Sequence, residues 1–486
     1  MPDHQTLYSP LSAVIRRQPV VVPPTASIDQ ALRIMNEAKV GSLVVTDPES
    51  GRPLGIFTLR DLLKRVALAS CDREQLITTV MSGARLVSLV GQATAYQAAL
   101  AMAQHRLRHI LVVDATGRLI GVVSQNDLYA LQRVGISEIS DEIREAMDIP
   151  ALQHAAGEIR RLAGNMLAAG LGAETLSQFI STLNDILTLR VIELTLGEFE
   201  LPEIDWCWIA LGSEGRYEQT FSTDQDNGII FDCPADSDSD ADSEAEAESL
   251  RQRFLSFAMA VNRKLDACGF PLCRGNIMAS NREWCLSLPE WRRQFSGWIH
   301  EAEPQALLNA SIFFDFRPLH GSAELSEQLR NWLLGVTAAN PLFLRRMAVN
   351  ALQCNPPLGW IRDFVYDHAE RFPHTIELKM YGSRPFVDAA RILALANGVA
   401  HTGTAQRLRA AGEQLQMPGE DIAALVQAFY FIQLQRLRHQ YDGRCDGENA
   451  NRIDPAALNE LDRQMLKQSF RQGKKLQQKL QLDYRL

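Results

Sequence analysis

Two segments in the first third of this chain resemble each other, and this internal repeat restricts the fold more than any other feature. One segment starts at Ser27 and the other at Thr94, and each shows the order helix, strand, turn, strand, helix. The equivalent glycines, Gly55 and Gly121, lie 66 residues apart. A unit of this size leaves one apolar face uncovered, so the repeat predicts two half-modules that stack on each other.

Each copy contains a short string of glycine, two apolar residues, a hydroxyl residue, two variable residues and aspartate. The strings are GIFTLRD at 55–61 and GVVSQND at 121–127. They resemble the signature of the CBS domain, and the resemblance covers residues 8–135 as a tandem CBS (Bateman) module. It implies a homodimer formed through the pair and an adenine nucleotide as regulator in a cleft between the halves. The residues that would contact this ligand are Thr58, Asp61, Ser124 and Asp127.

A second interpretation of these four residues stays open. Thr58 and Ser124 stand where a helix begins, so their hydroxyl groups could act only as N-caps. Asp61 and Asp127 would then be first-turn acids that favour the helix dipole. Binding of AMP, ADP or ATP to residues 8–135 would separate the two interpretations.

The segment most informative about chemistry lies between two short apolar runs in the middle of the chain. Gly212 and Ser213 follow the first run, and Asp224 and Asp226 precede the second. Glycine lets a phosphate group approach the backbone closely, and serine adds a hydroxyl group and an amide. Alternate residues at a strand start face one side, where two carboxylates repel unless a hard divalent cation lies between them. The spacing therefore predicts a phosphate cradle followed by a metal site for Mg²⁺ or Mn²⁺.

The full string, GSEGRYEQTFSTDQDN at 212–227, resembles the catalytic segment of the DNA polymerase β-like nucleotidyltransferase superfamily. Within it, the string is most similar to PII uridylyltransferase and glutamine synthetase adenylyltransferase. The whole chain resembles bacterial CBS-pair proteins that carry a nucleotidyltransferase domain and a C-terminal helical substrate-binding domain. Three later strings support this resemblance: RGNIMASN at 274–281, FDFRP at 314–318 and KMYGSRP at 379–385.

The resemblance implies a metal-dependent enzyme that moves a nucleoside monophosphate, UMP or AMP, from an NTP to an acceptor hydroxyl group. The CBS pair would control this transfer. Asp224 and Asp226 would hold the metal and act in catalysis. The nucleotide would be bound by Gly212, Ser213 and Arg216. The acceptor is not identified by the sequence, and a protein is one candidate.

Several charged residues near these motifs have two interpretations. Arg216 either contacts phosphate or pairs with Glu218. Asp185 either braces the site from the preceding helical segment or is an ordinary surface charge. Lys379 and Arg384 either hold an anionic partner or are solvated residues at a helix start.

The chain departs from the superfamily pattern in one respect. A third carboxylate is expected on a later strand, but residues 273–278 contain no acid. Asp315, in a predicted apolar strand that begins at 312–314, could substitute as a catalytic residue or could be structural and paired with Arg317. The missing acid keeps a second function open, a non-catalytic nucleotide-sensing regulatory protein with a degenerate transferase fold.

These observations predict a multidomain chain of the α/β and α+β classes. Its parts are a tandem CBS module at 8–135, a helical connector at 136–200, a mixed-sheet nucleotidyltransferase domain at 201–322 and a helical substrate-binding domain at 323–486. The connector either carries a signal from the CBS pair or forms a packing layer, and packing is the simpler interpretation.

Charge is unevenly distributed along the chain. The net charge is −9, and the run from Asp232 to Glu248 holds eight acidic residues and no basic ones. The low complexity of this run predicts a disordered insertion at 232–249. The rest of the chain is close to neutral, which argues against nucleic acid as a partner.

Hydropathy and cysteine content bear on the location of the protein. No apolar run reaches the roughly 18 residues that a membrane-spanning helix needs, so no membrane partner is expected. The eight cysteines are scattered without a C-x-x-C pair, which predicts reduced thiols rather than disulfides or zinc sites. Without a secretory signal pattern at the start of the sequence, these features predict a cytoplasmic protein.

Overall fold

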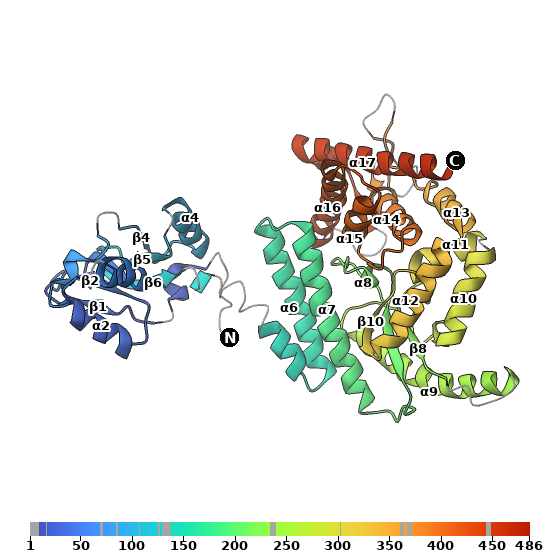
Figure 1. The fold of residues 1–486 in the computed structure, drawn as a ribbon, viewed down its shortest axis with the longest axis horizontal. Helices are drawn as coiled ribbons and strands as arrows, with labels where there is room; N and C mark the ends of the chain where they lie inside the picture. Colours follow the sequence, from blue (N-terminus) through green and yellow to red (C-terminus); the bar gives the residue numbers. More distant parts are fainter. Residues whose placement is uncertain are drawn as a thin grey trace. The chain divides into compact units, whose positions relative to one another are not determined.

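The computed structural model describes residues 9–486 with short gaps. The gaps are residues 16, 69–70, 84–85, 106, 125–126, 129–137, 234–239, 302, 360–363, 367–371 and 444–448. The chain divides into an N-terminal unit, residues 1–139, and a C-terminal unit, residues 140–486 (Figure 1). The large apolar cluster of the C-terminal unit includes no residue of the N-terminal unit, which has its own smaller clusters.

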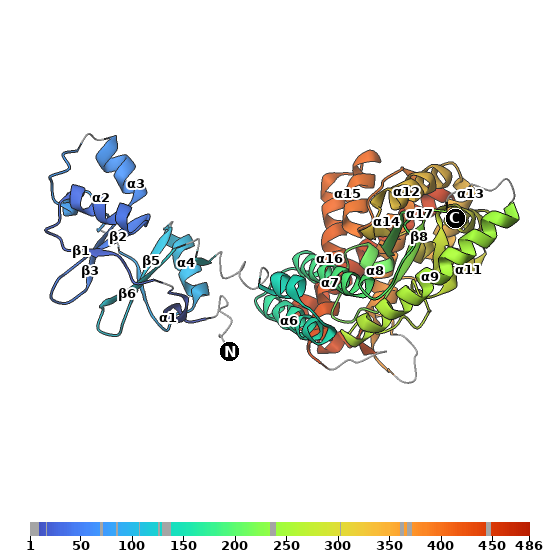
Figure 2. The ribbon, with the colours of Figure 1, turned by 90° about the horizontal axis from the view of Figure 1, so that it is seen from below.

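The N-terminal unit consists of two halves with the same topology (Figure 2). In each half a short strand pairs in parallel with a central strand, and the central strand pairs antiparallel with a third. The strands are β1 (Val21–Val22), β2 (Ser42–Thr46) and β3 (Pro53–Thr58) in the first half and β4 (Ser88–Val90), β5 (His109–Val113) and β6 (Leu119–Ser124) in the second. The helices are α1 (Leu11–Val14), α2 (Ile28–Glu37), α3 (Leu59–Asp61), the π-helix η1 (Leu62–Ala67), the 3-10 helix η2 (Ile77–Thr79) and α4 (Ala95–His105). The repeat predicted from the sequence is confirmed.

Packing explains why both halves need glycine at the same place. A Cβ atom at Gly55 in β3 would lie 2.2 Å from Sδ of Met81. A Cβ atom at Gly121 in β6 would lie 2.3 Å from Cδ1 of Ile15. Each glycine therefore lets another segment of the chain cross close to a strand of its sheet, whether or not a ligand binds nearby.

The C-terminal unit contains a mixed four-stranded sheet in the order β10-β7-β8-β9. The strands are β7 (Trp206–Ala210), β8 (Asn227–Phe231), β9 (Cys285–Ser287) and β10 (Arg317–Gly321). β7 is antiparallel to both of its neighbours, and β9 is parallel to β8. Alternate residues of a strand point to opposite faces of the sheet. Since apolar residues follow one another along these strands, both faces of the sheet are apolar. Trp208 packs edge-on against Phe257 of helix α9 (Asp240–Ala267), whereas Ile209 belongs to the large core on the other face.

Two long helices precede the sheet. They are α6 (Ile149–Ala168) and α7 (Ala173–Leu196). They pack on each other and on α9, and α7 also contacts β10. Within the C-terminal unit, these helices of the predicted connector at 136–200 thus form a packing layer.

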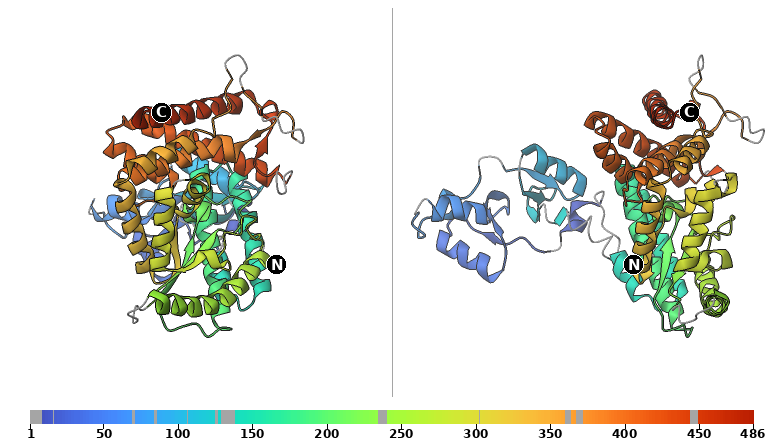
Figure 3. Two further views of the ribbon diagram at one scale, coloured as in Figure 1. Left: turned by 90° about the vertical axis from the view of Figure 1, so that its right-hand side faces the viewer. Right: turned by 45° about the vertical axis from the view of Figure 1, so that its right-hand side comes forward.

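The rest of the C-terminal unit is largely helical (Figure 3). Its elements are α8 (Gly212–Gly215), η3 (Arg282–Trp284), α10 (Leu288–Glu301), α11 (Pro304–Phe313), α12 (Ala323–Ala338), α13 (Pro341–Ala351), β11 (Ile376–Glu377), the π-helix η4 (Lys379–Ser383), α14 (Arg384–Ala396), α15 (Thr404–Gln414), α16 (Gly419–Tyr441), β12 (Arg452–Ile453), η6 (Pro455–Ala457) and α17 (Glu460–Tyr484). One apolar core extends from Ile209 in the sheet through Leu333 in α12 to Phe386 in α14 and Phe470 in α17. Residues 201–322 and 323–486 therefore share a single core.

The mixed α/β class, the CBS pair and the helical C-terminal region are confirmed, but two local predictions are wrong. The second half of the proposed disordered insertion at 232–249 is helical, because α9 begins at Asp240. Alanine and glutamate favour helix there, acids suit a helix N-terminus, and Glu248 pairs with Arg251 and Arg282. Residues 234–239 lie outside the described part of the chain.

The predicted strand at 312–314 is also wrong. Residues Ile312 and Phe313 end helix α11, and Phe314 is its C-cap residue. Three consecutive apolar residues do not distinguish a strand from the end of a buried helix. Among the described helices, none combines the length and hydropathy that crossing a membrane would need.

Candidate functional site

The aspartate pair lies beside the end of strand β7. The amide of Leu211 donates a hydrogen bond of 2.9 Å to the carbonyl oxygen of Asp226, which brings Gly212 next to the Asp226 side chain. Gly212 has a φ of +54°, and a Cβ atom there would lie 2.7 Å from Oδ2 of Asp226. Glycine is thus required both by the backbone conformation and by the space that the carboxylate occupies.

The residues between and after the two aspartates fix their direction. The Gln225 side-chain amide donates to the carbonyl oxygen of Asn262 in α9 at 2.9 Å. Asn262 in turn donates to the side-chain oxygens of Gln225 at 2.7 Å and Asn227 at 3.0 Å. Because Gln225 and Asn227 are buried against α9, the alternate residues Asp224 and Asp226 face the other way. The predicted one-sided aspartate pair is therefore found.

A cysteine completes this group. One ligand atom from each of Asp224, Asp226 and Cys273 lies within 4.8 Å of the others. The Cys273 thiol donates to Oδ1 of Asp226 at 3.4 Å. Two carboxylates and a sulfur form a donor set for a divalent cation. The residues present therefore fit a metal ion.

The pKa values of the side chains at this site also indicate that negative charge here lacks a matching positive charge. Burial raises the pKa of Asp226 to about 7, and the nearby Asp224 carboxylate acts in the same direction. Burial likewise raises the pKa of the Cys273 thiol to about 11, helped by the charge of Asp226. Burial raises the pKa of Glu214, in α8, to about 8 despite the opposing charge of Arg317. A cation at the pair would offset these penalties.

Asp224 also forms part of the wall of a cavity of about 700 Å³. Three cationic side chains of the described residues line the same cavity: Arg160 from α6, Arg274 from the loop after α9, and Lys379 from η4. Its volume lies in the range of small-molecule sites. Elements on both sides of residue 322 contribute to it, so the cavity lies between the sheet region and the C-terminal helices.

Two aromatic rings form another side of this cavity. The ring centroids of Phe221 and Tyr441 lie 5.5 Å apart, and both residues line the cavity. A Cβ atom at Gly164 in α6 would lie 1.9 Å from the Tyr441 ring. Gly164 therefore lets Tyr441 lie flat against the helix. Gln440 accepts a hydrogen bond of 3.3 Å from the Ser222 amide, which ties the end of α16 to the loop that leads to Asp224.

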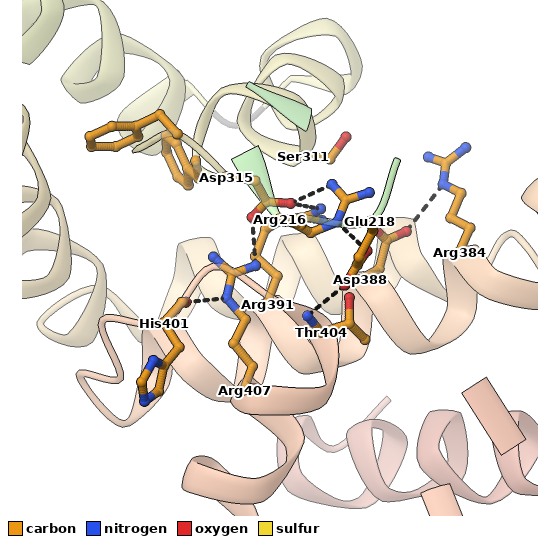
Figure 4. A network of polar contacts seen from close by, with 12 residues as sticks. Arg216, Glu218, Ser311, Asp315, Arg384, Asp388, Arg391, His401, Thr404 and Arg407 are labelled. Atoms are coloured by element: carbon orange, nitrogen blue, oxygen red, sulfur yellow. Dashed lines mark hydrogen bonds and ion pairs between the residues drawn. The ribbon is translucent and has the colours of Figure 1, made fainter. Parts of the chain in front are cut away.

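A different set of charges surrounds Asp315 (Figure 4). Its carboxylate accepts hydrogen bonds from Arg391 at 2.6 and 3.0 Å, from Arg407 at 2.5 Å and from Arg216 at 2.8 Å. Arg216 also donates to Glu218 at 2.7 Å, and Glu218 accepts from the amide of Thr404 at 2.7 Å. We call these six residues the Asp315 network. It joins the end of α8 to α14 and α15.

This network contradicts the prediction of Asp315 as a third catalytic carboxylate. Both of its oxygens are occupied by guanidinium groups, and the side chain is fully buried. Burial alone would raise the pKa of Asp315, but the charges of Arg391, Arg407 and Arg216 outweigh it and hold the pKa far below its usual range. Asp315 is structural.

The predicted partner of Asp315 is also different. Arg317 does not pair with it but donates to Asp185 of α7 at 2.6 Å and to the carbonyl oxygen of Glu214 at 3.1 Å. The interpretation of Asp185 as a brace is therefore supported.

The sequence left two interpretations open for the other charged residues, contact with a ligand or a structural role, and the structure favours a different one for different residues. Arg216 forms the expected salt bridge with Glu218, and its side chain is only 13% exposed, so it stabilises the region behind the aspartate pair. Arg384 pairs with Asp388 in the next turn of α14. Lys379 instead lines the cavity. Ser213 follows Gly212 in α8 and is partly exposed.

In the N-terminal unit, each hydroxyl residue forms a reciprocal pair with the aspartate three residues later. The Thr58 hydroxyl accepts from the Asp61 amide at 3.3 Å and donates to the Asp61 carboxylate at 2.8 Å. Ser124 and Asp127 form the same reciprocal pair, with distances of 3.2 and 2.5 Å. The capping role is confirmed at Thr58, the N-cap residue of α3, and ligand binding by these four residues stays a prediction.

Sequence reasoning missed Cys273, Arg160 and Tyr441. Cys273 and Arg274 lie in the segment 273–278 that lacks the expected acid, and the thiol in this segment is itself a metal-binding group. Arg160 and Tyr441 lie 64 residues before and 217 residues after Asp224, and no local pattern connects them to the motif.

Comparison with known families gives matches over most of the chain. Residues 11–68 and 78–133 match the CBS domain. Residues 157–305 match the family described as "Putative nucleotidyltransferase DUF294", and residues 341–484 match its "Putative nucleotidyltransferase substrate binding domain". The first of these two matches begins within α6 and includes the aspartate pair.

Several individual proteins are similar to about a quarter of the chain. An uncharacterized protein of Methanopyrus kandleri is 25% identical over 132 residues, which are 27% of this chain and 67% of that protein. An uncharacterized 17.7 kDa protein of Acidianus ambivalens is 32% identical over 120 residues, 24% of this chain and 70% of that protein. Among solved structures, a CBS domain protein from Pyrobaculum aerophilum complexed with AMP is 28% identical, covering 25% of this chain and 90% of that chain with a TM-score of 0.24. A CBS-domain protein from Agrobacterium tumefaciens is 31% identical, covering 26% and 96%, with a TM-score of 0.24.

Proposed function

Because the chain is a CBS-pair protein with a DUF294 nucleotidyltransferase domain and the associated substrate-binding domain, we propose that it transfers UMP or AMP from an NTP to an acceptor hydroxyl group. The α–β phosphoanhydride bond of the NTP breaks in this step, and pyrophosphate leaves. The observation that carries this proposal is the aspartate pair, of which Asp224 lines a cavity that Arg160, Arg274 and Lys379 also line. A carboxylate and cations together in a cavity of this volume suit a triphosphate with its metal ion.

Each side chain has a distinct task in this proposal. Asp224 and Asp226 hold Mg²⁺ or Mn²⁺, which when bound neutralises charge on the phosphates and stabilises charge that develops during transfer. Gly212 lets the backbone lie close to the Asp226 carboxylate, and Ser213 offers its hydroxyl group to a phosphate oxygen. Lys379 supplies a compact positive charge in the same cavity.

The nucleoside would lie toward the aromatic side of the cavity. Phe221 and Tyr441 offer faces on which a base can stack, and stacking of this kind accepts any base. Arg160 and Arg274 then lie along the same cavity as further partners for phosphate. The acceptor enters from the exposed side, and a protein hydroxyl group is one candidate.

Adenine nucleotide binding at the CBS pair would regulate this reaction. The Thr58–Asp61 and Ser124–Asp127 pairs each place a hydroxyl and a carboxylate together at a strand end, where ribose hydroxyl groups and phosphate could bind. We further propose a homodimer through the CBS pair and a cytoplasmic location. The seven described cysteines are free, which agrees with a reducing compartment.

A second candidate function is a nucleotide sensor that binds NTP without transferring any part of it. The observation that favours it is the Asp315 network, which removes the one additional carboxylate proposed for catalysis. In this case the cavity binds NTP and metal, and the signal passes to a partner.

Transfer of label separates the two candidates. The full chain is incubated with Mg²⁺, cell lysate and either ATP or UTP carrying a label at the α-phosphate, and the lysate is examined for labelled macromolecules or small molecules. We expect label to remain attached to an acceptor with wild type and to be absent with Asp226→Asn. Wild type that binds NTP with Mg²⁺ but labels nothing would favour the sensor, and NTP affinity unchanged in both Asp224→Asn and Asp226→Asn would overturn both proposals.

A further inference from the structure

The loop that carries Cys273 is fixed to the aspartate segment on both sides. The amide of Gln225 donates to the carbonyl oxygen of Pro271 at 3.1 Å, and the amide of Asn227 donates to that of Ile277 at 3.2 Å. Between these two bonds, the loop turns back through a hydrogen bond of 2.9 Å from the Asn276 amide to the Cys273 carbonyl oxygen. Cys273 is therefore held opposite Asp226 by backbone contacts that do not depend on its thiol.

The ligand atoms of this group come from two segments 47 residues apart in the sequence. Asp224 and Asp226 precede β8, and Cys273 comes from the loop after α9. The sulfur is close enough to both carboxylates to share one cation with them. Gly212 lies so close to the Asp226 carboxylate that a Cβ atom there would be 2.7 Å from its Oδ2. These contacts describe a pocket with three protein donors rather than a cysteine that happens to be near an acid.

We infer that Cys273 is the third protein ligand of the metal and that the site prefers a borderline divalent ion such as Zn²⁺ or Co²⁺ over Mg²⁺. This inference rests on the proposed metal-dependent function and changes its preferred metal from Mg²⁺ or Mn²⁺ to a borderline ion. A thiolate binds Zn²⁺ and Co²⁺ well, whereas Mg²⁺ selects oxygen donors and would be held by the two aspartates alone. The sulfur thus takes the place of the acid that the sequence lacks.

The ordinary alternative is a half-buried thiol that only donates a hydrogen bond to Asp226. In that case replacement of the sulfur by oxygen would keep the hydrogen bond and leave metal preference unchanged. The two interpretations therefore differ in the response of metal binding to Cys273→Ser, a change that keeps the shape of the side chain.

Cobalt provides a direct readout, because a thiolate bound to Co²⁺ gives a charge-transfer absorption band in the near ultraviolet. The full chain is titrated with Co²⁺ in the absence of nucleotide. We expect the band in wild type and in the control Cys354→Ser, since Cys354 is also partly buried but outside this group. We expect no band in Cys273→Ser or in the double variant Asp224→Asn, Asp226→Asn.

Metal affinities provide the second readout. Cys273→Ser should weaken Zn²⁺ binding by at least about tenfold, as loss of a ligand or of its close support does at other sites. Mg²⁺ affinity should stay within about twofold of wild type, because its donors are unchanged. Cys273→Asp should tighten Mg²⁺ and weaken Zn²⁺, which tests the same position even if the serine variant were unstable.

The inference fails if the band persists in Cys273→Ser or if the Zn²⁺ to Mg²⁺ preference is the same in wild type and variant. Its failure is distinguishable from failure of the proposed function. A cobalt–thiolate band in a protein that transfers no nucleotide supports the ligand assignment and rejects the enzyme. Label transfer with Mg²⁺ by a wild type that shows no cobalt–thiolate band supports the enzyme and rejects the ligand assignment.

Discussion

Asp315 and Asp226 belong to the same folded unit, and each is surrounded mainly by protein, yet the groups around the two carboxylates have opposite effects on their pKa values. Asp315 meets three guanidinium groups, and its pKa is far below the usual range. Asp226 meets another carboxylate and a thiol, and burial raises its pKa to about 7. The difference shows which carboxylate the fold neutralises with its own arginines and which has no bonded cation among the described residues.

The largest effect is expected at Asp315. Asp315→Asn should lower the free energy of unfolding by about 3–5 kcal/mol, because it leaves buried arginines without their shared counter-charge. Asp226→Asn should change it by less than about 1 kcal/mol at pH 7, since the amide resembles the protonated acid. Urea denaturation of both variants measures the contrast. Equal losses in the two variants would contradict the comparison.

The next largest effect is expected in the pH dependence of stability and comes from Glu214. The positive charge near this carboxyl group does not offset the cost of burying it. Its pKa is raised to about 8 in the folded state, whereas the unfolded chain loses this proton near its ordinary value of 4.5. The native state therefore binds more protons between these values, and its free energy of unfolding falls as the pH rises through this window.

Glu214→Gln should remove that slope, which amounts to at most about 1.4 kcal/mol per pH unit. Urea denaturation at several values from pH 5 to pH 8.5 compares the variant with wild type. The stability of the variant relative to wild type should increase with pH. Parallel profiles would show that Glu214 is ionised in the folded protein.

A smaller effect is expected from Gly212→Ala, which tests the close approach of backbone and carboxylate. The added methyl group meets Oδ2 of Asp226 at 2.7 Å, and the residue must keep a positive φ. We expect a loss of about 1–3 kcal/mol and weaker metal binding. Gly335→Ala in α12 is the matched control, because nothing lies within 4 Å of its added Cβ atom and alanine favours helix. A Gly212→Ala variant as stable as Gly335→Ala would argue against the crowding.

The smallest effect concerns Asp61, a carboxylate whose cationic partner among the described residues, Arg65, lies 3.7 Å away. Asp61 is bonded to the amide and hydroxyl of Thr58 and to the Ser82 hydroxyl. Thr58→Ala should lower the melting temperature of the N-terminal unit by an amount equivalent to about 1 kcal/mol, the usual value of an N-cap. Thr79→Ala, at an exposed position in η2, is the control and should change it by less than about 0.5 kcal/mol. Calorimetry with and without AMP would also show whether Thr58 contributes to ligand binding.

The parts of this molecule that could be predicted from sequence are those encoded locally. The glycine-to-aspartate strings predicted both halves of the repeat, because a strand, a turn and a cap lie within a few residues of one another. The alternation in Asp224 to Asn227 predicted the one-sided carboxylate pair for the same reason. In contrast, Asp315 is neutralised by Arg391 and Arg407, which are 76 and 92 residues away. No local pattern distinguishes such arginines from surface charges, so the third carboxylate was misassigned.

The Asp315 network also has a consequence for synthesis of the protein, because its members leave the ribosome at different times. Glu218 is made 186 residues before Thr404, which bonds to it, and Asp315 is made 92 residues before Arg407. At the usual rates of translation, on the order of ten seconds or more separates Glu218 from its partner. During this interval the sheet region holds acids without their arginines and an apolar face without its helices. The nascent chain should therefore depend on chaperones until α15 has emerged, and folding should then proceed as one late, slow step governed by these distant contacts.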